Sequence, residues 1–209
     1  MKPELEERLV GLENIIHGIH HNLELMSFIN YNLHREPFNL GNNLGLFWIW
    51  TSLMASQILE FYKLTNKKEK FSFTKTINIA KENKCKADFV NLETKTKELV
   101  EIYDKSDYEA VRSKYLAHQD LNVPEIGTEL KGIADFSKKS VELFTLFCNE
   151  FKREQTEFNP EITESFSQIF KTIDEYEKVK ALLIARLIQG NETIAISEIQ
   201  DIVNENNSG

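Results

Sequence analysis

Residues 4–33 have the sequence ELEERLVGLENIIHGIHHNLELMSFINYNL, and the order of its apolar side chains decides the fold class. These apolar positions follow one another in alternating steps of four and three residues, along the series Leu5, Leu9, Leu12, Ile16, Ile19, Leu23 and Met26. Such spacing places an apolar seam along one side of a helix, which is typical of a helix packed lengthwise against another. We therefore expect one long helix over residues 4–33.

Outward from this stretch, helical spacing continues along the chain. It predicts helices over about 43–63, 72–84, 88–104, 107–117 and 128–155, one after Pro160, and a short last one near residue 200. Only 4 prolines and 8 glycines occur in 209 residues, which favours long uninterrupted helices. The expected fold is all-α, a bundle of long antiparallel helices with a C-terminal helical extension. We expect a single domain over residues 1–206, in which 128–206 could pack as a helical subdomain, and a disordered tail at 207–209.

The composition places the chain among ordinary globular proteins. Hydrophobic residues make up 41% and charged residues 28%, enough for a real core. Cys85 and Cys148 fit no metal or redox spacing and suggest free thiols in a reducing compartment. The first residues are acidic, unlike a signal peptide, and the apolar run 44–59 is shorter than the about 20 residues that span a bilayer. These features predict a cytoplasmic protein with no membrane partner.

One segment differs in charge from the rest. Residues 63–86 contain eight lysines and two acidic residues, a net +6, whereas the whole chain carries −8 with a pI near 5.3. An acidic protein is a poor non-specific binder of nucleic acid. A confined basic patch could still guide an RNA strand to one place, and its candidates are Lys67, Lys68, Lys70 and Lys75. The alternative is a solvated loop and helix face.

The most specific chemistry lies in the sequence SDYEAVRSKYLAHQD, residues 106–120. Ser106 suits a helix N-cap, and Pro124 favours a helix stop near His118. The guanidinium of Arg112 can hold phosphate oxygens in a bidentate way, and His118 can move a proton near neutral pH. On an ideal helix these two side chains lie about 120° apart. They meet on one phosphate if His118 lies at the frayed helix end, or if two copies of the site face each other.

The segment Arg112-Ser-Lys-Tyr-Leu-Ala-His118-Gln-Asp120 resembles the Arg-x(4–6)-His signature of the HEPN superfamily. It is most similar to the abortive-infection, AbiU-type branch. The resemblance implies an all-helical protein that cleaves RNA without a metal, with Arg112 on the scissile phosphate and His118 as general acid or base. It also implies that Tyr115 or Asp120 orients these two residues.

Two further positions enter through the same resemblance. HEPN proteins commonly have an acidic residue that supports the motif arginine on the preceding long helix, and Glu60 is the candidate here. Many active members have Asn, Asp or His directly after that arginine, where this chain has Ser113.

Two classes of function follow. The first is a metal-independent endoribonuclease of a phage-defence or toxin–antitoxin system, which cuts single-stranded RNA and has a cognate antitoxin protein as partner. The second is a catalytically silent HEPN-like module that binds RNA, a nucleotide or a protein. The intact Arg–His pair favours the first, and Ser113 with the acidic surface favours the second. We expect no cofactor, and we expect a homodimer, since a closed dimer doubles the few groups of a sparse site.

Three histidines, His17, His20 and His21, lie beside the apolar seam of residues 4–33. His17 and His21 are four residues apart, a spacing that could hold a metal from one helix face. No acidic residue lies inside the cluster, and a second helix would have to complete it. A polar flank is the favoured interpretation, and no metal site is predicted.

Overall fold

The computed structural model describes residues 2–33, 44–118 and 130–157, together with 168, 171–172, 175–176 and 178–185. Every regular element in these residues is a helix, which confirms the predicted all-α class. The labelled helices are α1 (Pro3–Leu33), α2 (Leu44–Thr65), α3 (Phe73–Glu82), α4 (Phe89–Lys105), α5 (Tyr108–His118) and α6 (Leu130–Phe151). None of the helices in the described residues is long and apolar enough to cross a bilayer.

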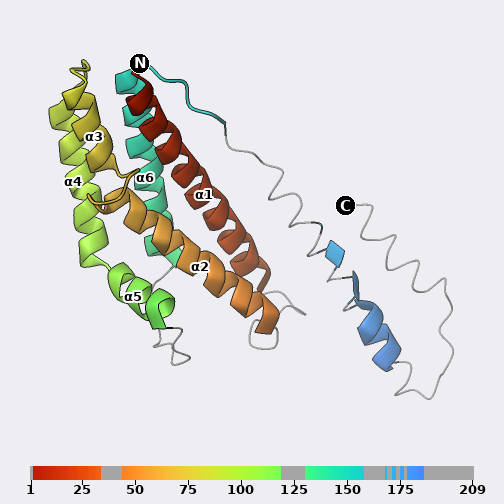
Figure 1. Ribbon diagram of the computed structural model, residues 1–209. Helices are drawn as coiled ribbons and strands as arrows, with labels where there is room; N and C mark the ends of the chain where they lie inside the picture. Colours follow the sequence, from red (N-terminus) through yellow and green to blue (C-terminus); the bar gives the residue numbers. More distant parts are fainter. Residues whose placement is uncertain are drawn as a thin grey trace.

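The long helices pack as neighbouring antiparallel rods (Figure 1). α1 contacts both α2 and α6, and α4 packs against α6 from the other side. The short helix α3 lies beside α4, whereas α5 follows α4 and packs against α2. The end of α2, the start of α3, the end of α4 and α5 therefore come together in one region of the molecule.

The apolar seam of α1 forms the spine of the core. Its predicted members are fully buried except Leu23, which is partly buried and packs against the core. Opposite the seam, α6 supplies Phe136, Phe144 and Phe147, each with 0% exposure. Burying aromatic and aliphatic side chains of this size is the main driving force for assembling the helices. α6 thus shares one core with α1 and α2.

A polar side chain crosses this core at Gln57 of α2. Its Nε2 donates to the carbonyl oxygen of Ile19 at 3.1 Å and to Oγ of Ser137 at 2.9 Å, so it joins α1, α2 and α6. Gln57 is completely buried. Since buried polar groups are costly without partners, the two bonds of Nε2 favour this register of the three helices.

The helix ends differ slightly from the expected ones. α6 stops at Phe151, a few residues before the expected end at about 155, because Lys152 adopts a left-handed backbone with φ 53°. The N–H of Lys152 donates to the carbonyl of Asn149 at 3.2 Å, and the N–H of Arg153 to that of Cys148 at 2.9 Å. This is the Schellman arrangement that satisfies the last carbonyls of a helix. α3 ends in the same way, with φ 56° at Lys84.

Candidate functional site

The motif helix α5 begins at a sharp junction with α4. Oγ of Ser106 donates to the carbonyl of Tyr103 at 2.6 Å and accepts the N–H of Tyr108 at 3.3 Å. The predicted cap therefore serves both helices: it closes the end of α4 and satisfies a free amide at the start of α5. The junction sets the direction in which α5 runs after α4.

Two buried side chains then anchor α5 to the core. Tyr108 and Val111 are each 4% exposed. The centroid of the Tyr108 ring lies 5.4 Å from that of Phe61. It lies 5.9 Å from that of Phe136, in an edge-on arrangement. Burial, with a smaller contribution from the charge of Asp135, raises the pKa of Tyr108 to about 12, so its hydroxyl stays protonated at neutral pH. Because these two side chains anchor the helix, the position of the next residue, Arg112, is also fixed.

Arg112 lies at the surface in a defined orientation. The centre of its guanidinium is 4.2 Å from the centroid of the Tyr62 ring of α2. Nε donates to Oε2 of Glu109 at 3.0 Å, and Nη2 donates to Oε1 at 2.5 Å. The hydrogen bond between these two groups raises the pKa of Arg112 and lowers the pKa of Glu109. Both groups are charged at neutral pH, and the arginine is fixed by a ring on one side and a carboxylate at one edge.

A third group joins this pair. The hydroxyl of Tyr103, at the end of α4, donates to Oε2 of Glu109 at 3.2 Å. Tyr103 is 5% exposed, and its burial, together with the nearby Glu109 charge, raises its pKa above the ordinary value of 10. Tyr103 is therefore a neutral hydrogen-bond donor at this site.

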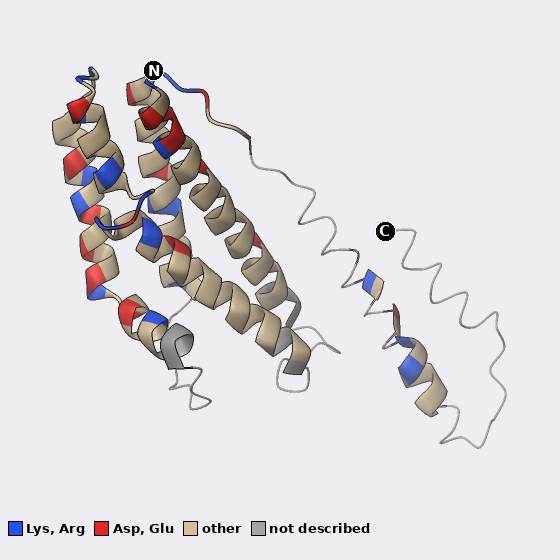
Figure 2. Cartoon of the chain, in the orientation of Figure 1, with Lys and Arg blue, Asp and Glu red and all other residues tan. Residues whose placement is uncertain are grey.

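These side chains line a surface groove of about 680 Å³. Its walls come from α2, the turn after it, α3, α4 and α5, and are formed by Tyr62, Thr65, Asn66, Lys67, Thr74, Val100, Tyr103, Asp104, Glu109 and Arg112. The groove contains two cations and two carboxylates. Figure 2 shows the same mixture of signs along α4 and α5. The region is thus not a broad basic surface, and any attraction for an anion comes from individual residues.

The structure brings together some of the predicted site residues. Lys67 lines the groove that contains Arg112, although the two are far apart in sequence. Lys68 and Lys75 are exposed outside its lining. Lys70 forms an ion pair with Glu7 of α1 at 2.5 Å and lies over the Phe71 ring. Of the predicted basic patch, only Lys67 shares the groove.

The supporting residues fall in different places. Glu60 accepts a hydrogen bond from Lys63 at 2.8 Å, and the carboxylate partner of Arg112 is Glu109 rather than Glu60. Ser113 is exposed, and its hydroxyl donates to the carbonyl of Ala110 at 3.1 Å.

The remaining motif residues are only partly covered. Tyr115 and His118 belong to α5, and His118 is its last residue. The structure describes only the backbone of these two residues. Asp120 lies outside the described residues altogether. Arg112 and His118 therefore lie on one continuous helix.

Sequence reasoning missed Glu109, Tyr62 and Tyr103. A signal for Glu109 was present, since an acid three residues before an arginine on a helix lies on the same face. Tyr62 and Tyr103 carry no comparable signal, because each lies on a different helix from Arg112 and only the packing brings them to it.

The histidines of α1 form a ring cluster. The centroids of His17 and His21 are 6.2 Å apart, and Nε2 of His20 lies 3.2 Å from Oε1 of Glu24. Burial lowers the pKa of His20, against an opposing effect of Glu24. Within the described ranges, no group of three or more His, Cys, Asp or Glu side chains is arranged to hold a metal ion.

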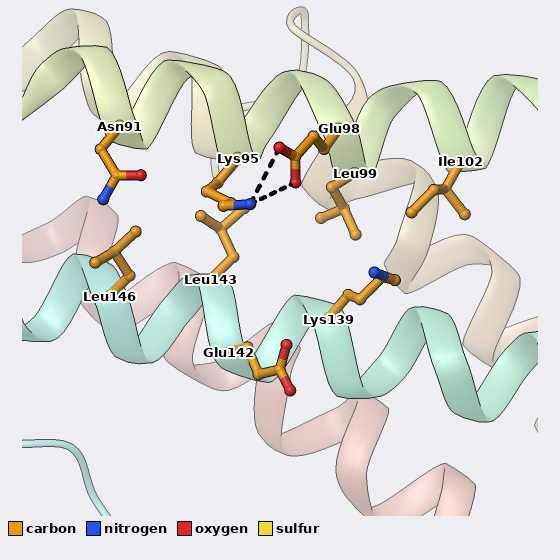
Figure 3. Close-up of a pocket in the computed structure, with 9 residues that line it drawn as sticks. All are labelled: Asn91, Lys95, Glu98, Leu99, Ile102, Lys139, Glu142, Leu143 and Leu146. Atoms are coloured by element: carbon orange, nitrogen blue, oxygen red, sulfur yellow. Dashed lines mark hydrogen bonds and ion pairs between the residues drawn. The ribbon is translucent and has the colours of Figure 1, made fainter.

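A second hollow, of about 350 Å³, lies between α4 and α6 (Figure 3). Its apolar lining includes Leu99, Leu143 and Leu146, and Lys95 pairs with Glu98 along α4 at 2.8 Å. No residue of the Arg–His motif lines it.

Comparisons with protein-family models, curated proteins and solved structures find no match to this chain. The described residues form an all-α bundle with a groove that contains an oriented arginine.

Proposed function

We propose that this protein is a HEPN-like, metal-independent endoribonuclease that cleaves single-stranded RNA with Arg112 and His118, as part of a phage-defence or toxin–antitoxin system. The observation that carries the proposal is the placement of Arg112. It has a fixed orientation, a permanent charge and a surface groove beside it, to which Lys67 adds a second cation. A planar guanidinium fork matches the paired oxygens of a phosphodiester, as it does those of a carboxylate.

The chemistry needs few groups. The 2′-hydroxyl of the substrate attacks the adjacent phosphorus once its proton is removed, and the bond to the 5′-oxygen of the next nucleotide breaks when that oxygen is protonated. His118 supplies proton transfer in one of these steps, and Arg112 stabilises the charge on the phosphate oxygens. The products are a 2′,3′-cyclic phosphate and a free 5′-hydroxyl. No step requires a metal-bound water.

The test is cleavage of a mixed-sequence single-stranded RNA by the purified chain in EDTA. We expect products with 2′,3′-cyclic phosphate ends and a rate that peaks between about pH 6 and 8, where histidine exists in both protonation states. His118→Ala should lower the rate by about 10²- to 10⁴-fold. Arg112→Lys should recover only part of the activity lost in Arg112→Ala, because lysine offers no planar fork.

The matched control is Lys105→Ala, which removes an exposed cation of α4 outside the groove lining and should leave the rate unchanged. Cleavage that requires an added divalent metal, or that survives the loss of His118, would contradict this mechanism. RNA binding that depends on Arg112 without any cleavage would support the second class of function, a silent binding module. That outcome is favoured by Ser113, which stands where many active HEPN proteins have Asn, Asp or His, and by the acidic surface.

A further inference from the structure

Three hydrogen-bond donors of the groove converge on one carboxylate. Oε2 of Glu109 accepts from Nε of Arg112 at 3.0 Å and from the hydroxyl of Tyr103 at 3.2 Å, while Oε1 accepts from Nη2 of Arg112 at 2.5 Å. The Glu109 side chain is 54% exposed, so it lies at the mouth of the site rather than in the core. The groups best suited to hold an anion are thus already occupied by an anion of the protein.

The carboxylate of Glu109 is similar in shape and charge to the phosphodiester of an RNA substrate. A carboxylate presents two oxygens to the guanidinium fork in parallel hydrogen bonds, and a phosphodiester presents its two non-bridging oxygens in the same way with the same single charge. The phenol of Tyr103 remains protonated because of its raised pKa and could donate equally well to a phosphate oxygen. Nothing in this arrangement of donors is specific to a carboxylate.

We propose that Glu109 occupies the position of the RNA phosphodiester and must be displaced before the substrate can engage Arg112 and Tyr103. This inference rests on the proposed function and adds a self-inhibiting contact to it. Displacement is feasible because exposed ion pairs within one helix are weak. The released carboxylate can turn into solvent, since it lies at the surface of α5.

A different role for Glu109 makes the opposite prediction. If Glu109 served to orient Arg112 toward the substrate, its loss would weaken RNA binding, because the guanidinium would no longer be held. If it is a competitor, its loss strengthens binding, and does so more when Arg112 is present than when Arg112 is absent. The direction of the change and its dependence on Arg112 separate the two roles.

The experiment measures the Kd of a fluorescent single-stranded 2′-O-methyl RNA, which lacks the nucleophilic hydroxyl, in EDTA at one fixed ionic strength. Glu109→Gln should bind roughly two- to fivefold more tightly than the unchanged protein, the range expected when an exposed ion pair no longer competes. Asp104→Asn is the matched control, since it removes an equal charge from the same groove without touching Arg112. Asp104→Asn should tighten RNA binding clearly less than Glu109→Gln does. In the Arg112→Ala background, Glu109→Gln should strengthen binding by no more than Asp104→Asn strengthens binding of the unchanged protein.

Each outcome decides something. Unchanged or weaker binding by Glu109→Gln overturns the inference. It is also overturned if the gain keeps its full size without Arg112, or if Asp104→Asn gives an equal gain. In those cases Arg112-dependent binding by the unchanged protein leaves the proposed function standing. If Arg112→Ala binds this RNA as well as the unchanged protein does, the proposed site fails and the inference fails with it.

Discussion

Glu13 shows how a single residue ties the end of the bundle to α1. It is 6% exposed, and its carboxylate accepts from Nη2 of Arg153 at 2.6 Å and from the N–H of Thr156 at 2.8 Å. Arg153 also donates to Glu6 at 3.2 Å. Burial by itself would raise the pKa of Glu13, but these hydrogen bonds and the Arg153 charge outweigh it and lower the pKa from 4.5 to about 2. Arg153 and Thr156, which follow α6, are thereby held against α1.

This shift predicts acid sensitivity with a definite sign. Because the folded-state pKa is below the unfolded value, the stabilisation is complete above about pH 4.5 and is lost as the pH falls toward 2. We expect Glu13→Gln to be less stable at pH 7 by about 1–3 kcal/mol, since Arg153 loses its buried charged partner and keeps only Glu6. Urea unfolding at several pH values should show this difference shrinking between about pH 5 and 3. A difference that stays constant over that range would show that the Glu13 charge does not stabilise the fold.

The groove shows at residue scale what sequence can and cannot predict. Arg112 and Lys67 could be selected from their charge and local context, and the structure places both in one groove. The carboxylate partner could not be fixed in the same way, because helices contain many acid–base pairs at the right spacing. Glu60 followed from a family pattern, whereas the actual partner of Arg112 is Glu109, three residues earlier on α5 itself.

At the scale of elements, helix interiors were predictable and helix ends were less so. The spacing of apolar residues depends on helical periodicity, so the extent of α1 agrees with the predicted 4–33 almost to the residue. The end of α6 depends instead on one left-handed residue, and sequence usually marks such a position with glycine. Here it is Lys152, which carries no such signal.

The left-handed lysine leads to a stability prediction. A non-glycine residue in this conformation costs about 1–2 kcal/mol, and glycine removes this cost. Glycine also gives the unfolded chain more freedom, which offsets part of the stabilisation. Lys152→Gly should therefore stabilise the protein by roughly 0.5–1 kcal/mol, measured as a higher midpoint of urea unfolding. Lys138→Gly, at an exposed position inside the same helix, should destabilise it by about 1 kcal/mol. Destabilisation by both changes would show that Lys152 makes contacts that outweigh its strain.

At the scale of the whole molecule, the proposed cleavage draws on only two motif residues of one chain, Arg112 and His118. Arg112 and His118 lie on one helix, where six residues separate them by about 9 Å along the axis and about 120° around it. Two such side chains point away from each other unless the helix end departs from ideal geometry. A second copy related by a two-fold axis would bring the arginine of one chain to the histidine of the other. We therefore propose a homodimer with the motif segments near its axis.

Mixing of inactive variants tests this assembly. Sedimentation at micromolar concentration should show a dimer. If each site combines Arg112 of one chain with His118 of its partner, a heterodimer of Arg112→Ala and His118→Ala subunits contains one intact site. Random exchange makes about half of the dimers heterodimers, so a mixture of two inactive proteins should recover about a quarter of the original cleavage rate. A monomer would refute the dimer. A dimer without recovery of activity would mean that each site takes Arg112 and His118 from the same chain. Every subunit in the mixture lacks one of these two residues, so no such site would be intact.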